Sequence, residues 1–149
     1  MFALLVVACF VAFFLTQHLK HTPTVVQSFR LTPFFSPTPS GHVKQERISF
    51  KLARADEVTV TIVDSTGATV ATLLRDHPVA RYKQLSLRWT GKLGWAHGYA
   101  LVPGPEGRQA LRPKLAGAPA PAGVYRVRVT LRKQHRSVLS PRSFTLVRP

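Results

Sequence analysis

The sequence has little cysteine and few acidic residues. Cys9 is its only cysteine, so an intrachain disulfide is excluded. It has 6 Asp and Glu residues against 21 Lys and Arg residues, and its net charge is +15. So few carboxylates offer little acid–base chemistry for a hydrolase, whereas the excess of positive charge favours an anionic partner. Because the basic residues are spread along the chain rather than gathered in one run, a generally basic surface is the alternative.

Sequence motifs of catalysis and metal binding are also lacking. No Gly-x-Ser-x-Gly stretch and no phosphate-binding loop occurs. The stretch DSTG, Asp64–Gly67, differs from an aspartic-protease motif because its glycine comes one residue late, and Asp64 fits a turn better. No convincing ligand pair exists among the histidines, which are His18, His21, His42, His77, His97 and His135. We therefore predict a protein that is not an enzyme, with no catalytic residue, no metal site and no cofactor.

The first fifteen residues, MFALLVVACFVAFFL, carry no polar side chain apart from Cys9. As a helix they would reach roughly 22 Å, and continuing through Leu19 comes nearer to a bilayer core of about 30 Å. We predict that residues 1–20 are a hydrophobic helix that anchors the protein in a membrane. A cleaved secretory signal is the alternative, although no basic region precedes the run and no small-x-small cleavage site follows it.

Two further readings of this segment stay open. Val6–Cys9, VVAC, looks like a lipoprotein box, but most of the apolar run follows Cys9, which argues against lipidation. Lys20 and His21 follow the run and nothing positive precedes it, so the positive-inside rule alone would keep the domain cytoplasmic. A start site upstream of Met1 would restore a basic segment, and we expect an extracytoplasmic domain.

Beyond this segment the sequence predicts a spacer and then a domain of strands. Residues 21–42 contain four prolines and predict an extended, Pro-rich spacer, in which Phe34–Gly41 could form a first edge strand. From residue 43 on, apolar and polar residues alternate in short runs that are separated by turn residues, and no helical period is present. This predicts an all-β fold, an antiparallel β-sandwich of about seven strands over residues 43–149. The expected core residues are Phe50, Val60, Trp89, Tyr125 and Val127.

Residues 92–121 interrupt this rhythm. The segment is rich in Gly and Pro, and a connection of this length is usually functional or disordered. We expect a long insert in the sandwich that forms a loop with a small hairpin. Its Trp95 and Tyr99 are candidates for an exposed contact patch, and a hairpin that folds back on its own sandwich is the alternative.

Three stretches resemble the Ig-like domain of the flagellar hook-assembly type, which also recurs in secreted bacterial proteins. They are RISFKLARADEVTVTIVDSTGATVATLL, LSLRWTGK and PAPAGVYRVRVTLRK. The residues shared with the family pattern are Asp64, Gly67, Thr72, Leu73, Trp89, Gly91, Pro121, Ala122, Gly123 and Tyr125. Thr90 stands where the family usually has Asp, and the link between Gly91 and Pro121 is longer than usual. The resemblance covers roughly residues 43–147 and implies an Ig-like sandwich with a structural or adhesive role and no active site of its own.

The strand predicted over Gly123–Lys133 carries a row of basic residues. Arg126, Arg128 and Arg132 share the face opposite Tyr125, and Lys133 follows them. These four residues are the candidate contacts for a polyanion, either an acidic polymer or anionic lipid. A solvated exterior is the alternative, because antiparallel sheets commonly turn one polar face to water. Nucleic acid is a less favoured partner because Tyr125 points with the core residues and cannot stack on bases from the basic face.

Together these features predict a non-enzymatic, membrane-tethered, extracytoplasmic Ig-like module that makes structural or adhesive contacts at the cell envelope. The expected partners are an envelope protein or an anionic envelope polymer or lipid, with the membrane contacted through the N-terminal helix. A cleaved and secreted form is the alternative for its location. The alternative function is a basic protein that binds nucleic acid or another polyanion, and a scaffold or cap for a surface filament is a third hypothesis.

Overall fold

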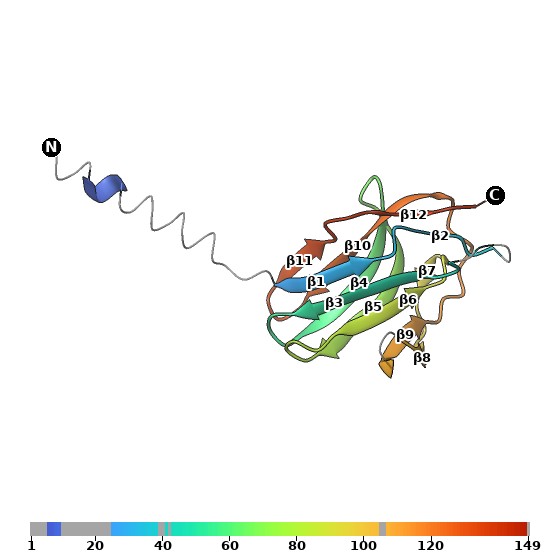
Figure 1. Ribbon diagram of the computed structural model, residues 1–149, viewed down its shortest axis with the longest axis horizontal. Coiled ribbons are helices and arrows are strands. Elements are labelled where there is room, and N and C mark those ends of the chain that lie inside the picture. Colours follow the sequence, from blue (N-terminus) through green and yellow to red (C-terminus); the bar gives the residue numbers. More distant parts are fainter. Residues whose placement is uncertain (1–5, 10–24, 39–40, 42, 105–106, 149) are drawn as a thin grey trace.

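The computed structural model describes residues 6–9, 25–38, 41, 43–104 and 107–148, and apart from Val6–Cys9, which is helical, its regular structure is mostly β (Figure 1). The strands are β1 (Val26–Leu31), β2 (Phe34–Phe35), β3 (Glu46–Leu52), β4 (Asp56–Asp64), β5 (Thr69–Val79), β6 (Leu85–Trp89), β7 (Gly94–Trp95), β8 (Tyr99–Pro103), β9 (Gln109–Pro113), β10 (Gly123–Leu131), β11 (Arg136–Leu139) and β12 (Phe144–Leu146). Most of the helix predicted for residues 1–20 lies outside the described residues. Within the described part of the chain, no helix has the length and apolar character needed to span a bilayer.

The strands form two sheets that pack as a sandwich (Figure 1). The five-stranded sheet has the order β1-β3-β6-β9-β8, and the seven-stranded sheet has the order β2-β12-β10-β4-β5-β7, with β11 beside β10. The two sheets agree with the predicted all-β sandwich, but the described residues form twelve strands rather than about seven, and the sheets are mixed rather than antiparallel. Three pairs are parallel, namely β2–β12, β5–β7 and β6–β9, because short strands from the spacer and the insert add to a largely antiparallel framework.

The core lies between the two sheets and follows the two-residue period of the sequence. Along β3 and β10 every second residue is buried, because successive side chains of a strand point to opposite faces. Trp89 is fully buried, and its ring lies 5.7 Å from those of Phe35 and Tyr125 and 5.9 Å from that of Phe144. The indole nitrogen of Trp89 donates a hydrogen bond to the carbonyl of Lys92 at 2.9 Å. The remaining residues expected in the core are also buried, namely Phe50, Val60, Tyr125 and Val127.

Residues expected to form a spacer contribute two strands to the sandwich. β1 pairs with β3, and the Phe29 ring lies 5.5 Å from that of Phe50, while β2 pairs with β12. The sandwich therefore begins at β1 rather than at residue 43. Pro33 lies between the two strands, where it removes no hydrogen bond from either ladder. The chain enters through β1 at one end of the sandwich, and the C-terminus lies at the opposite end (Figure 1).

The predicted insert over residues 92–121 contains the expected small hairpin, β8–β9, but its strands join both sheets rather than lying in a separate loop. β7 pairs with β5 in the seven-stranded sheet, and the β8–β9 hairpin extends the five-stranded sheet beyond β6. β6 and β9 are in register only at Leu87 and Leu111. The hairpin thus joins the five-stranded sheet through a parallel neighbour, β6.

Candidate anion-binding site

The predicted basic row lies on the outer face of the seven-stranded sheet, where its first two arginines are half-buried. Arg126 donates a hydrogen bond to the carbonyl of Pro141 at 3.3 Å, and Arg128 donates one to the carbonyl of Gly67 at 3.5 Å. Both guanidinium groups therefore lie against neighbouring backbone rather than projecting as a free row.

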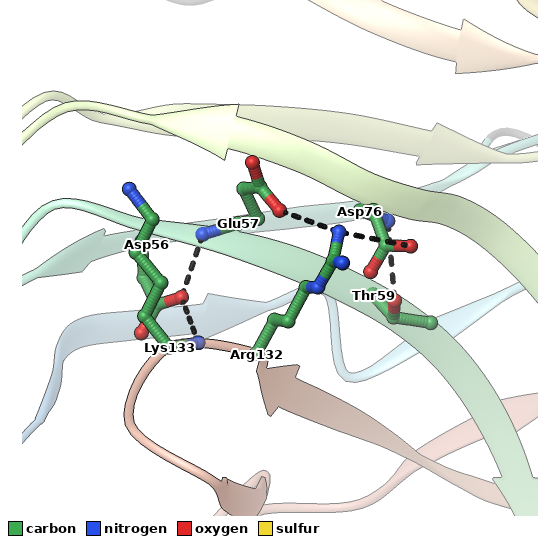
Figure 2. Close-up of polar contacts among 6 residues, drawn as sticks. All are labelled: Asp56, Glu57, Thr59, Asp76, Arg132 and Lys133. Atoms are coloured by element: carbon green, nitrogen blue, oxygen red, sulfur yellow. Dashed lines mark hydrogen bonds and ion pairs between the residues drawn. The ribbon is translucent and has the colours of Figure 1, made fainter.

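The other two predicted polyanion contacts, Arg132 and Lys133, lie beside acidic residues (Figure 2). The Arg132 guanidinium is 3.0 Å from the carboxylate of Glu57 and 3.9 Å from that of Asp76. The backbone amide of Lys133 donates to the carboxylate of Asp56 at 2.8 Å. The lysine side chain takes no part in this bond and is exposed. The charge of Arg132 is offset by two carboxylates, which weakens the case for a polyanion surface here, whereas the Lys133 side chain has no ion pair with a described residue.

Asp56 ties the turn between β10 and β11 to the start of β4. Its carboxylate accepts hydrogen bonds from the amides of Glu57, Lys133 and Gln134 and from the Gln134 side chain. Desolvation is the largest single influence on the pKa of Asp56 and raises it, but these hydrogen bonds together outweigh desolvation and hold the pKa below its usual value. The role of Asp56 is thus to fix a turn.

The two aromatic contacts predicted in the insert do not form one patch. Trp95 and Tyr99 are 61% and 45% exposed, but Trp95 belongs to β7 in one sheet and Tyr99 to β8 in the other. The Arg75 guanidinium lies 5.1 Å from the Trp95 ring centre, and the His77 ring meets the Tyr99 ring edge-on at 5.7 Å.

Four arginines gather on the outer face of the five-stranded sheet. A pocket of about 380 Å³ is lined there by four arginines and by small polar residues. The arginines are Arg30 from β1, Arg47 from β3, Arg88 from β6 and Arg108, which precedes β9. The polar residues of the lining are Thr32, Ser49, Gln84 and Ser86. No carboxylate lines the pocket among the described residues, and Glu106 lies outside them.

Strand pairing and the β8–β9 hairpin bring these arginines together. Arg47 and Arg88 are direct partners across the β3–β6 pair, and Arg30 follows on β1 beside β3. The hairpin closes the pocket with Pro103 and Gly104. The amide of Gly104 donates to the carbonyl of Arg108 at 2.7 Å, and a Cβ at this position would lie only 2.7 Å from that same oxygen. Glycine is therefore required for the tight approach that positions Arg108.

No described residue supplies a negative charge to the pocket. Arg88 is only 8% exposed, and its one hydrogen bond is a long one, 3.4 Å, to the carbonyl of Leu87. Burial lowers the pKa of the Arg88 guanidinium, and repulsion by Arg47 lowers it further. Arg108 donates to the side-chain oxygen of Gln84 at 3.0 Å, whereas Arg30 and Arg47 have no hydrogen bond or ion pair with any described residue. The Arg88 side chain lines the pocket, and no described carboxylate faces it, so an external anion would stabilise this arrangement.

One carboxylate lies close in sequence but inside the core. Glu46 on β3 is fully buried beside Arg47, and neither of its oxygens has a hydrogen-bond partner. Burial raises the pKa of Glu46 to about 8, although the nearby amide of Thr32 has a smaller effect in the opposite direction. That amide donates to the carbonyl of Arg47 at 3.2 Å, which explains why it does not satisfy the carboxylate. The protonated, neutral Glu46 is therefore favoured at neutral pH.

Several guanidinium groups around one cavity can bind an oxyanion through paired hydrogen bonds. Arginine presents a planar fork of donors that matches phosphate and carboxylate, and such charge-assisted bonds are roughly twice as strong as neutral ones. Sequence reasoning missed this site because its arginines are scattered between residues 30 and 108. One feature of the sequence could have indicated the site. Arg47 and Arg88 each stand at an outward-facing position of a strand whose opposite face is largely apolar.

Comparisons with family models, with curated proteins and with solved structures find no match to this chain. Nowhere in residues 6–9, 25–38, 41, 43–104 and 107–148 do three or more His, Cys, Asp or Glu side chains gather as metal ligands.

Proposed function

We propose that this protein is a non-enzymatic, membrane-tethered, extracytoplasmic Ig-like module that binds an anionic polymer of the cell envelope. The observation that carries the proposal is the pocket of four arginines on the five-stranded sheet, in which Arg88 is buried and has no counter-ion among the described residues. The polymer contacts are thus assigned to Arg30, Arg47, Arg88 and Arg108 in place of the row on β10.

The Ig-like assignment is supported by one hydrogen bond in addition to the sequence resemblance. In Ig-like sandwiches a tyrosine near the start of a strand bonds back to the backbone a few residues upstream. The hydroxyl of Tyr125 donates to the carbonyl of Pro121 in this way, and the Tyr125 ring packs edge-on against Trp89. Two packed sheets around this pair are compatible with the proposed fold.

The binding proposal is tested with the full-length protein in detergent micelles. Hyaluronate and polyphosphate serve as anionic polymers, and uncharged dextran serves as the control. We expect both anionic polymers to bind and the double substitution Arg47→Gln with Arg88→Gln to weaken their binding at least about tenfold, a loss of about 1.4 kcal/mol. The matched variant carries Arg126→Gln and Arg128→Gln on the other sheet and should retain most of the affinity.

Two results would count against the binding proposal. One is equal affinity of the pocket variant and the unmodified protein while both melt cooperatively. The other is loss of binding in the Arg126 and Arg128 variant alone, which would return the site to the row on β10.

The location is tested separately in intact cells that produce the full chain with a C-terminal tag. An external protease should remove the tag without lysis if the domain is extracytoplasmic. Protection of the tag until the cells are lysed would refute the proposed location.

Nucleic acid is the second candidate partner, because tyrosines lie near basic residues on the five-stranded sheet. Tyr82 and Tyr99 line a groove together with Lys51 and Lys83, and aromatic rings beside cations are the usual elements of single-strand binding. Titration with single-stranded DNA at rising salt tests it, since binding through phosphates must weaken steeply as salt increases.

A further inference from the structure

A second cavity adjoins the arginine pocket on the five-stranded sheet. It is a groove of about 670 Å³ between the end of β5, the start of β6 and the β8–β9 hairpin. Leu85 at the start of β6 and Gln109 at the start of β9 both line the groove. Gln84, Ser86 and Arg108 line both cavities, so the two adjoin along these residues and are called the joined site below.

The groove differs from the pocket in its chemistry. Its lining is mainly aromatic and apolar, from Tyr82, Tyr99, Leu101, Leu111 and Val79. Tyr82, Tyr99 and Leu101 are 55%, 45% and 58% exposed, so these side chains offer open apolar surface.

Polar groups are placed along this apolar lining. Gln84 and Gln109 supply both donors and acceptors, and Lys51 and Lys83 bring positive charge. Aromatic faces with nearby amide groups suit a sugar ring, because its faces are apolar C–H groups and its edges carry hydroxyl groups.

Charged and apolar lining residues are unevenly distributed along the joined site. This distribution indicates how widely the negative charges of its ligand should be spaced. Four arginines surround the pocket of about 380 Å³, whereas the larger groove of about 670 Å³ adds only Lys51 and Lys83, which stand among tyrosines and leucines. The density of positive charge therefore falls along the joined site, which matches a densely charged polymer poorly. A polymer with neutral rings between its charges fits both parts.

We propose that the joined site binds an anionic glycan, with one phosphate or sulfate substituent held by the arginine pocket and the adjoining uncharged sugar rings lying along the tyrosine groove. This inference rests on the proposed function, since it specifies the polymer that the pocket binds. Arg108 lines both cavities and contacts the junction between the charged group and the first ring. Its position is fixed by its hydrogen bond to Gln84.

The test measures binding of four probes to the full-length protein in detergent micelles by calorimetry. The probes are a short oligosaccharide with one phosphate ester, its sulfate-ester counterpart, the same oligosaccharide without a charged group, and inorganic phosphate. We expect the phosphorylated oligosaccharide to bind at least about tenfold more tightly than either the neutral oligosaccharide or inorganic phosphate. The sulfate-ester probe shows which of the two tetrahedral anions the pocket prefers, and binding of either ester with this advantage supports the inference.

Two groups of variants divide the site. Tyr82→Ala and Tyr99→Ala should weaken the esterified oligosaccharide about tenfold and leave inorganic phosphate unchanged. Arg47→Gln should weaken both probes. The matched control is Trp95→Ala, an exposed aromatic on β7 of the other sheet, which should change neither.

The failure of this inference and the failure of the proposed function give different results. If the tyrosine variants bind every probe as the unmodified protein does, or if single-stranded DNA or polyphosphate binds more tightly than the ester, the glycan assignment is wrong. The arginine pocket then still serves as a general polyanion site, provided that the Arg47 variant loses affinity. If Arg47→Gln changes nothing for any probe, the proposed function fails as well.

Discussion

Arg47 and Arg88 lie directly opposite each other on neighbouring strands of the five-stranded sheet. Like charges directly opposite each other destabilise a sheet. Burying a charged side chain is also unfavourable, and Arg88 is buried. Both side chains open into the same pocket. Residues that oppose stability in this way are commonly found at functional sites, where a ligand compensates for them.

Phosphate should stabilise the protein through this pocket. A ligand that binds only the folded state, at one hundred times its dissociation constant, adds about 2.7 kcal/mol to the free energy of unfolding. We expect a higher melting temperature in sodium phosphate than in sodium chloride at the same ionic strength. Arg47→Gln should abolish the difference and, without phosphate, raise the free energy of unfolding by about 0.5 kcal/mol because the repulsion is removed. An equal response of the variant and the unmodified protein would contradict the assignment.

Glu46 should make stability fall as the pH rises. Its pKa is raised to about 8 in the folded protein from 4.5, so the folded state retains a proton that the unfolded state loses between these two values. Stability is therefore greatest below pH 4.5 with respect to this group and decreases up to about pH 8, at about 1.4 kcal/mol per pH unit at most.

The substitution Glu46→Gln removes this titration. We expect the variant to exceed the unmodified protein in free energy of unfolding by about 2 kcal/mol or more at pH 8 and to differ little from it at pH 4.5. Chemical denaturation across this pH range measures both curves. Parallel curves would show that Glu46 does not titrate between the two values.

Asp56 should have the opposite dependence on pH. Its folded-state pKa is lowered, so its contribution is present above the ordinary value of 3.8 and is lost as the pH falls through the folded pKa. Asp56→Ala removes the acceptor of four hydrogen bonds, and we expect it to lower the free energy of unfolding by about 3 kcal/mol. Amide exchange should locate the loss at Lys133 and Gln134, and unchanged protection there would refute the role.

The Tyr125 hydroxyl should contribute measurably to stability. Tyr125→Phe keeps the ring against Trp89 but removes the hydrogen bond to Pro121, and it should lower the free energy of unfolding by about 1 kcal/mol. Tyr82→Phe is the matched control because Tyr82 is 55% exposed, and it should have little effect. Equal stabilities of the two variants would argue against the bond as an element of the fold.

Much of the sandwich could be predicted from the alternation of apolar and polar residues. The runs around Phe50, Val60 and Val127 predicted strands with one buried face, and these strands are present with those residues in the core. The short strands were harder to predict. β2 and β7 have two residues each, and their register is set by a parallel neighbour that is distant in sequence.

The candidate site was less accessible to sequence reasoning. The row of Arg126, Arg128 and Arg132 was visible because its members share one strand, but Arg132 pairs with Glu57, which is 75 positions away. The arginine pocket was hard to predict from the sequence because its four arginines come from four separate segments, which contribute one each.

The sequence by itself determined that the chain forms strands and which side of each strand is apolar, because both follow from the positions of neighbours two residues apart. Only the tertiary structure decided which basic residues act together. The order β1-β3-β6-β9 placed four separate arginines around one cavity, and the β8–β9 hairpin beside β6 formed one side of the adjoining groove. Strand order depends on long-range packing, which no local pattern of residues encodes.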